Sequence, residues 1–254
     1  MIILKAISET ITTIIVTSAL IIISITIFYY ALIILQQSSI SAEYGYVKTL
    51  FINLANSFPD IVEGGSYAAG IPSRIVGLGY RELDNSYVTI IATKDGYNAF
   101  YYTDNPIVIE AVAYHAIVTT NSTLYGTDDV VVDQTQLIPR VTESYHEGAT
   151  FIRLDTCRVY VKVYETTGSF GTKYIINVLY IKITPKIISS SPKRLVISFS
   201  NIDTTTIADA DDVVIRVKQG SNLQIYNIRD LYNIPSGATI DVNIIIKELG
   251  VIYL

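Results

Sequence analysis

The 254-residue sequence is poor in the residues that usually build stable sites. It has a single cysteine, Cys157, one methionine and no tryptophan. One cysteine excludes an internal disulfide framework and any multi-cysteine zinc site, so Cys157 is expected to be a small buried residue. Only 16% of the residues are charged, against roughly 25% in typical soluble proteins, and the net charge of −5 comes without a basic cluster. Nucleic acid is therefore not an expected partner.

The usual catalytic patterns are also missing. His115 lies in the apolar run AVAYHAIV and is expected in the core or in a sheet, not as a catalytic base. His146, in TESYHEGAT, is expected in a solvated loop, with a cation contact beside Glu143 and Glu147 as the less favoured alternative. There is no G-x-S-x-G elbow, and the glycine-rich stretches lack the lysine and the strand–helix context of nucleotide-binding motifs. We therefore expect no enzymatic activity and no cofactor.

Two polar motifs are candidate sites of other kinds. Carboxylates cluster before a strand in IADADDV, as in loops that bind hard cations, but the glycine and distal glutamate of a complete calcium loop are absent. Calcium is thus only an alternative for Asp209, Asp211 and Asp212, and a weaker one for Asp128 and Asp129. Asn121 begins an N-x-[ST] sequon in a polar stretch and is a candidate for glycosylation.

What the sequence does have is a long charge-free segment near its N-terminus. From Thr10 to Ala42 there is no charged residue, and Thr10–Leu35 reads TITTIIVTSALIIISITIFYYALIIL. A helix of these 26 residues measures roughly 39 Å, enough to cross a hydrocarbon core of about 30 Å. Lys5 precedes the segment, so the positive-inside rule places the N-terminus in the cytoplasm and the remainder outside. A cleaved signal peptide fits less well, because its apolar region is shorter.

The helical pattern continues beyond the apolar segment and becomes one-sided. We predict a helix over residues 5–57, with Gly45 as the candidate kink and Pro59 as the end of the pattern. Residues 1–58 are assigned to the leader and helix, and residues 59–254 to an extracellular β-rich head. The apolar face of the second half consists of Val47, Leu50, Phe51, Leu54 and Phe58.

After Pro59 the pattern has a period of two. Glycines at 64–79 indicate a loop-rich stretch, and the Asp95-Gly96 turn predicts a hairpin between Tyr87–Thr93 and Tyr97–Tyr102. A run of alternating residues around 159–163 is expected to pair with the run around 179–183, in which Tyr180 and Lys182 alternate with the apolar residues. The fold class is therefore α+β, with a long hydrophobic helix and an antiparallel sandwich-like or barrel-like head. The residues expected to point inward are Val159, Val161, Val163, Leu195, Ile197, Phe199, Val242, Ile244 and Ile246, with Lys162, Arg216 and Lys247 outward.

The N-terminus shows a short basic leader, a small residue and one acidic residue ahead of the apolar helix, in the run Lys5-Ala6-Ile7-Ser8-Glu9. Thr12, Thr13, Thr17, Ser18, Ser24 and Thr26 are hydroxyl residues of the helix that favour contacts within a helical bundle over simple residence in lipid. On these residues, the first 58 or so resemble the type IV pilin superfamily, most closely archaeal type IV pilins, adhesion filament subunits and archaellins.

The resemblance implies a processing site and an assembly segment. It implies a cut after Ala6 by a prepilin peptidase, with Ile7 first and Glu9 third in the mature chain. A cut after Leu4 would place Glu9 fifth, where the family often has glutamate, and the position stays open between the two. The candidate assembly residues are Glu9, Ile14, Ile22, Phe28, Tyr29 and Tyr30.

The resemblance further implies a homo-oligomeric helical filament at the cell surface, inserted in the cytoplasmic membrane as a precursor and built by an assembly ATPase and membrane platform. The alternative is a single-pass, surface-anchored β domain, such as a minor pilin or an archaellum accessory protein. A membrane-tethered enzyme or binding module is a third and less favoured interpretation.

Overall fold

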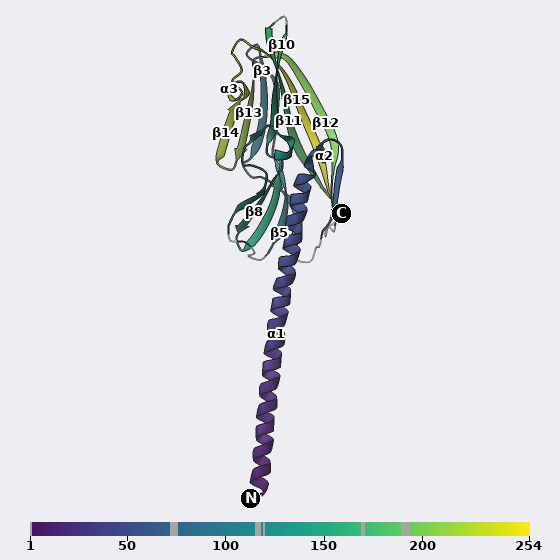
Figure 1. Ribbon diagram of the computed structural model, residues 1–254, viewed down its shortest axis with the longest axis vertical. Coiled ribbons are helices and arrows are strands. Elements are labelled where there is room, and N and C mark those ends of the chain that lie inside the picture. Colours follow the sequence, from purple (N-terminus) through teal and green to yellow (C-terminus); the bar gives the residue numbers. More distant parts are fainter. Residues whose placement is uncertain (1, 72–75, 115–117, 119, 169–170, 189–193) are drawn as a thin grey trace. The chain divides into compact units, whose positions relative to one another are not determined.

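The computed structural model describes residues 2–71, 76–114, 118, 120–168, 171–188 and 194–254, with side chains from Ile11 onward (Figure 1). His115 lies outside the described residues. The chain divides into two compact units, Met1–Gly45 and Tyr46–Leu254. The second unit, called the head below, therefore includes the last turns of the long helix.

The predicted helix is confirmed. Helix α1 spans Ile2–Asn56, and its helical residues continue through Gly45 without a break. The short helix α2, Phe58–Val62, follows after Ser57. Pro59 was expected to end the helical pattern, but it lies in the first turn of α2, where a missing N–H has no intrahelical partner to lose.

The apolar face predicted for the second half of the helix is buried within the head. The residues Val47, Leu50, Phe51, Leu54 and Phe58 are each at most 5% exposed. Polar contacts also fix this part of the helix: the Tyr46 hydroxyl donates to the Gly70 carbonyl at 3.1 Å, and Lys48 Nζ pairs with the Glu143 carboxylate at 3.1 Å. The last turns of α1 are thus part of the head's core.

The head is β-rich and mostly antiparallel, and its described strands form three sheets. The six-stranded sheet has the order β1 (Ser66–Gly70), β12 (Arg194–Ala210), β15 (Thr239–Tyr253), β11 (Gly171–Ile187), β10 (Val159–Gly168) and β7 (Val131–Val132). The four-stranded sheet has the order β14 (Asn222–Asn227), β13 (Asp212–Gln219), β3 (Tyr87–Lys94) and β4 (Tyr97–Asp104). The five-stranded sheet has the order β2 (Val76–Glu82), β5 (Ile107–Ala113), β9 (Ala149–Asp155), β8 (Arg140–His146) and β6 (Ser122–Tyr125). Two short helices complete the chain, the 3₁₀ helix η1 (Thr135–Leu137) and α3 (Ile228–Leu231).

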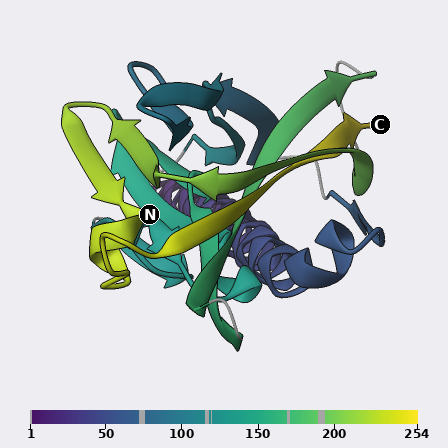
Figure 2. The ribbon, with the colours of Figure 1, turned by 90° about the horizontal axis from the view of Figure 1, so that it is seen from above.

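The sequence predicted an antiparallel head, but the six-stranded sheet also contains parallel strand pairs. Strands β11 and β15 pair in parallel along their length, and β10 and β7 pair in parallel over two residues. In Figure 2, β15 (yellow) crosses the head beside β12 (green), with which it pairs antiparallel. Parallel partners buried on both faces carry near-continuous apolar runs, and this accounts for the runs VLYIKI in β11 and VNIII in β15.

The predicted hairpin is confirmed, and its turn geometry explains why the Asp-Gly pair is needed. Strands β3 and β4 pair antiparallel around Asp95 (φ 53°) and Gly96 (φ 77°). Two consecutive positive φ angles define the type I′ turn, which matches the twist of the flanking strands and favours Asp-Gly. Similarly, β10 and β11 form the predicted pair, with Gly168 opposite Gly171.

The predicted strand register is confirmed for Lys162 and Arg216, which are exposed. It was wrong for Lys247, which was expected to point outward: Lys247 shares a covered face of β15 with the buried Leu249 and Val251, and its Nζ donates to the Val62 carbonyl at 2.8 Å. Six of the nine residues expected to point inward are at most 2% exposed, namely Val159, Val161, Leu195, Ile197, Val242 and Ile244. The remaining three, Val163, Phe199 and Ile246, are partly buried.

Strand β11 departs from a simple alternation because both of its faces are covered. Ile181 and Ile183 are buried, and so is Tyr180, which is 1% exposed on the opposite face. Tyr180 belongs to the core shared by the six-stranded and four-stranded sheets, and its hydroxyl donates to Asp104 Oδ2 at 2.8 Å. Tyr180 therefore points into a core and not to solvent, although it alternates with apolar residues as Lys182 does.

The glycine-containing stretch 64–79 was expected to be loop-rich, but it contains β1 and part of β2. Gly65 is needed for a close approach: its N–H donates to the Asp60 carbonyl at 2.9 Å, and a Cβ there would lie 2.7 Å from that oxygen. This contact connects α2 to the start of β1, so the glycine serves the helix-to-sheet turn and not an open loop.

We expect Phe51→Ala to lower the free energy of unfolding of the fragment Ser38–Leu254 by about 3–5 kcal/mol, because Phe51 is fully buried in the head. Chemical denaturation measures this change. Asn53→Ala, two residues away on the exposed side of the same helix, is the matched control and should change stability by less than about 0.5 kcal/mol. Equal effects of the two substitutions would mean that the helix face does not belong to the head's core.

Candidate assembly segment and the polar network of the head

The N-terminal unit presents one continuous apolar surface. Every residue from Ile11 to Ser39 is exposed, although the segment carries no charge. The candidate assembly residues with described side chains are all strongly exposed: Ile14 58%, Ile22 64%, Phe28 66%, Tyr29 67% and Tyr30 65%. Soluble proteins rarely leave contiguous apolar surface of this extent in water, so this surface requires lipid or protein around it.

The helix is long and apolar enough to cross a membrane. The candidate span Ile11–Asn56 contains a window with a mean hydropathy of 2.5. A signal sequence near an N-terminus can also be apolar enough to enter a membrane, so membrane insertion is compatible with the helix and is not specific to an anchor. The candidate processing residues Lys5, Ala6 and Ile7, together with Glu9, lie within α1, and their side chains are not among those described.

The sequence predicted that the helix hydroxyls favour contacts within a helical bundle, but three of them bond to carbonyls of their own helix. Thr17 Oγ1 donates to the Thr13 carbonyl at 2.5 Å, Ser18 Oγ to the Ile14 carbonyl at 2.7 Å, and Thr26 Oγ1 to the Ile22 carbonyl at 2.8 Å. A hydroxyl bonded to the carbonyl four residues earlier needs no partner on a second helix. At these three positions the hydroxyls are therefore equally suited to lipid and to a bundle, and the case for a bundle rests on the apolar surface.

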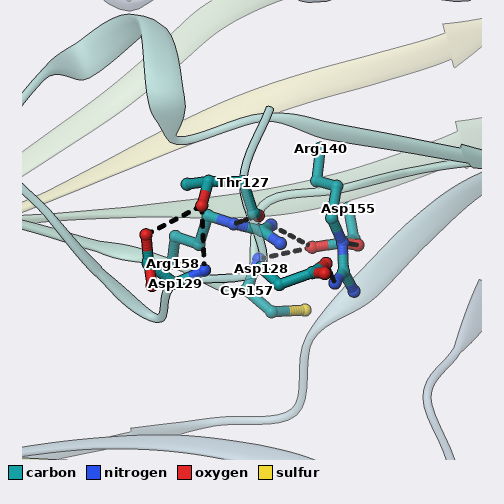
Figure 3. Close-up of polar contacts among 7 residues, drawn as sticks. All are labelled: Thr127, Asp128, Asp129, Arg140, Asp155, Cys157 and Arg158. Carbon is teal, nitrogen blue, oxygen red and sulfur yellow. Dashed lines mark hydrogen bonds and ion pairs between the residues drawn. The ribbon is translucent and has the colours of Figure 1, made fainter. Parts of the chain in front are cut away.

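The head contains a buried ion network that the sequence analysis missed (Figure 3). Arg158 is 1% exposed, and its Nη1 donates to Asp155 Oδ1 at 2.7 Å while its Nε donates to the Thr127 carbonyl at 2.9 Å. From the other side, Arg140 Nε donates to Asp155 Oδ2 at 3.1 Å. A single buried carboxylate thus lies between two guanidinium groups.

The outer end of the network reaches solvent. Arg140 Nη1 donates to Asp128 Oδ1 at 2.7 Å, and the Asp128 side chain is 79% exposed. Asp129 accepts from the Thr127 hydroxyl at 2.8 Å. The two carboxylates that were weak calcium candidates are therefore engaged in positioning the β6–β7 loop.

The network connects two sheets through the chain segment between them. Arg140 and Asp155 belong to β8 and β9 of the five-stranded sheet, whereas Arg158 lies just before β10 of the six-stranded sheet. No signal in the sequence could have located it, since Asp155 and Arg158 are three apart in an extended segment and the other members come from distant residues.

Cys157 is buried, as predicted, and chemically inert. Burial, with the neighbouring Asp155 carboxylate, raises the pKa of the Cys157 thiol well above its usual value. A thiol held in its protonated form is neither a nucleophile nor a metal ligand. Cys157 therefore contributes packing at the network.

The remaining sequence candidates lie apart from the network. His146 is exposed at the end of β8, 3.4 Å from Glu147, while the nearby Glu143 is buried against Lys48. Asn121 is exposed, and its Oδ1 accepts from the Tyr145 N–H at 3.3 Å, so the sequon remains a candidate for glycosylation.

Two of the three carboxylates considered for calcium, those of Asp211 and Asp212, accept hydrogen bonds from backbone N–H groups. Asp211 accepts from the Gly96 N–H at 2.9 Å at the β3–β4 turn, and Asp212 accepts from the Val213 N–H at 2.7 Å. Asp209 donates its own N–H to Asp241 at 3.2 Å. Across the described residues, no group of three or more histidine, cysteine or acidic side chains is arranged to hold a metal ion.

We expect Asp155→Asn to lower the head's free energy of unfolding by about 3–5 kcal/mol, because it leaves two largely buried guanidinium groups without their shared carboxylate. Asp128→Asn removes the exposed partner of the same Arg140 and should cost at most about 1 kcal/mol. Denaturant unfolding of both variants compares the two effects. A small loss for Asp155→Asn would show that the network contributes little to stability.

No family model, no curated protein and no solved structure matches this chain. The function is therefore inferred from the residues themselves. The two features that carry such an inference are the apolar helical segment exposed over residues 11–39 and a β-rich head with its own core and its own polar network.

Proposed function

We propose that the chain is a structural subunit of an extracellular, archaeal type IV pilus-like filament, with adhesion as its role. The helix anchors the subunit in the membrane before assembly and packs against other copies of itself afterwards. The observation that carries this proposal is the uncharged, fully exposed surface of residues 11–39. The resemblance of the N-terminal residues to archaeal pilins supports the same assignment and implies the prepilin peptidase, assembly ATPase and platform as partners.

During assembly, the same helix surface passes from one environment to another. In the membrane the surface contacts lipid tails, and in the filament it contacts equivalent helices. A contact between two different patches on identical subunits generates a helical polymer when the rotation that it repeats does not close into a ring. The head, for which we propose a sandwich-like arrangement of the six-stranded and four-stranded sheets, stays outside in both states.

The alternative is a single-pass, surface-anchored β domain, such as a minor pilin or an archaellum accessory protein. In the sequence, the helix hydroxyls were a reason to prefer a bundle over this alternative. The contacts of Thr17, Ser18 and Thr26 within the helix remove that reason at these three positions, since they need no neighbouring helix. Electron microscopy of filaments sheared from cells, with mass spectrometry of the dominant protein, separates the two. An abundant filament made of this chain supports the subunit, and its absence supports the anchor.

We expect Ile22→Asp to abolish filaments in cells that lack the native gene. A carboxylate at the centre of a membrane-spanning helix costs about 2.5–3.5 kcal/mol on insertion, and the cost recurs for each subunit packed in a water-free filament core. Ile22→Leu, which keeps an apolar side chain of the same volume, is the control and should assemble normally.

The membrane fraction distinguishes failure of insertion from failure of assembly. If the Ile22→Asp chain still reaches the membrane but forms no filaments, packing between helices is the step affected. Normal filaments from Ile22→Asp would refute the packing role of the helix.

We expect the mature subunit to begin at Ile7, because a cut after Ala6 follows the small residue of the basic leader. Mass spectrometry of the N-terminal peptide from surface filaments or membranes measures this directly. A peptide beginning at Lys5 would assign the cut after Leu4 instead, and an uncut Met1 peptide from assembled material would contradict processing altogether.

A further inference from the structure

A cavity of about 350 Å³ lies within the head, where the five-stranded sheet faces the turns of the four-stranded sheet. Strands β8 and β9 supply Arg140 and Arg153, the loop after β2 supplies Leu83 and Asp84, and the β13–β14 turn supplies Gly220. All of the lining residues belong to the Tyr46–Leu254 unit, so the cavity is independent of the N-terminal apolar segment.

Three arginines line this cavity, and each is held by a carboxylate that uses only part of its guanidinium group. Arg81 Nη2 donates to Asp84 at 3.1 Å, and Arg153 Nε donates to Glu110 at 2.5 Å. Arg140 donates twice, to Asp155 and to Asp128. A guanidinium group has five N–H donors, so most of these donors remain for another acceptor.

The guanidinium nitrogens of Arg140 and Arg153 that have no partner are not buried. Among the described residues no buried side-chain nitrogen or oxygen lacks a hydrogen-bond partner, so Arg140 Nη2 and both Arg153 Nη atoms, to which the described residues supply none, contact solvent. The Arg140 and Arg153 side chains are only 19% and 26% exposed, which limits their freedom, whereas Arg81 is 52% exposed. Two positioned guanidinium groups and one adaptable group therefore surround one wet cavity.

The net charge around the cavity does not by itself favour an anion. Arg81, Arg140, Arg153 and the neighbouring Arg158 are balanced by Asp84, Asp155, Glu110 and Asp128. Selection would instead come from directed N–H donors, which favour the paired oxygens of carboxylate, sulfate and phosphate groups. An entering oxyanion competes with the two exposed carboxylates, Asp84 (80%) and Asp128 (79%), whose surface ion pairs are weak.

The size of the cavity points to an anion with an organic body. Ligand pockets usually measure about 300–1,000 Å³, so a volume near 350 Å³ is suited to a group of roughly monosaccharide size. Leu83 and Val108 add apolar wall to the arginine side. We propose that this cavity binds a small organic oxyanion, such as a sugar acid or a sugar phosphate, through Arg81, Arg140 and Arg153.

The test is isothermal titration of the full chain, in a non-ionic detergent at constant ionic strength, with glucuronate, glucose 6-phosphate and neutral glucose. We expect at least one of the two anions to bind and glucose not to bind. Arg81→Gln should weaken that binding at least roughly tenfold, because it removes a charge-assisted contact. Its one ion-pair partner among the described residues, Asp84, is exposed, so the variant should retain the thermal stability of the parent protein without ligand.

Arg194→Gln, which removes an exposed arginine outside the cavity, is the matched control and should leave the affinity unchanged. Binding of one anion only would identify the preferred acidic group within the proposed class. The proposal is overturned if neither anion binds, if glucose binds equally well, or if Arg194→Gln weakens binding as much as Arg81→Gln. None of these outcomes bears on filament assembly, which depends on the N-terminal helix.

Discussion

The head depends on covering both faces of the parallel pair β11 and β15. One face, which includes Tyr180 and Val242, forms the core shared with the four-stranded sheet. The other face of β15 carries Lys247, Leu249 and Val251, of which the latter two are fully buried. Lys247 donates to the Val62 carbonyl of α2, so the helical segment after α1 lies on this second face. Because helix and sheet share this burial, a head cut at Pro59 would lose part of its core.

This constraint also explains the position of the polar groups. A sheet covered on both sides leaves little room for water, and the polar groups at its margin must therefore pair with one another. Asp155 illustrates this: it satisfies Arg158 at the junction with the six-stranded sheet and Arg140 on the five-stranded sheet. Of these three residues, Arg140 and Asp155 also line the cavity. The ion pair that joins β8 to β9 is thus shared between the buried network and the cavity wall.

The sequence was sufficient wherever structure depends on neighbouring residues. The charge-free run predicted α1, the Asp95-Gly96 pair predicted the β3–β4 hairpin, and the period of two predicted which side of β10 and β13 is buried. Each of these follows from local geometry alone. The amphipathic face from Val47 to Leu54 was also predictable, because apolar residues spaced three and four apart lie on one side of a helix, and such a side packs against a core.

Features that depend on distant residues could not be predicted in this way. The parallel pairing of β11 with β15 joins segments about 65 residues apart, as in the pair Ile176–Val242, and an alternating pattern is the same for either direction. The loop-rich prediction for 64–79 was wrong because glycine there serves the contact of Gly65 with Asp60. The arginine network and the cavity draw on β2, β8, β9 and the β13–β14 turn, and only the folded chain brings these together.

The two units have opposite requirements for solvent, and this limits the functions open to the chain. The head has a buried apolar core and exposes charged side chains such as Lys162 and Arg216, so its surface is suited to water. Residues 11–39 expose apolar side chains on all sides, and their backbone groups, like the hydroxyls of Thr17, Ser18 and Thr26, bond within the helix. These three hydroxyls therefore need no polar partner outside the helix. Lipid and a bundle of identical helices suit them equally, and packing between helices decides between the two surroundings.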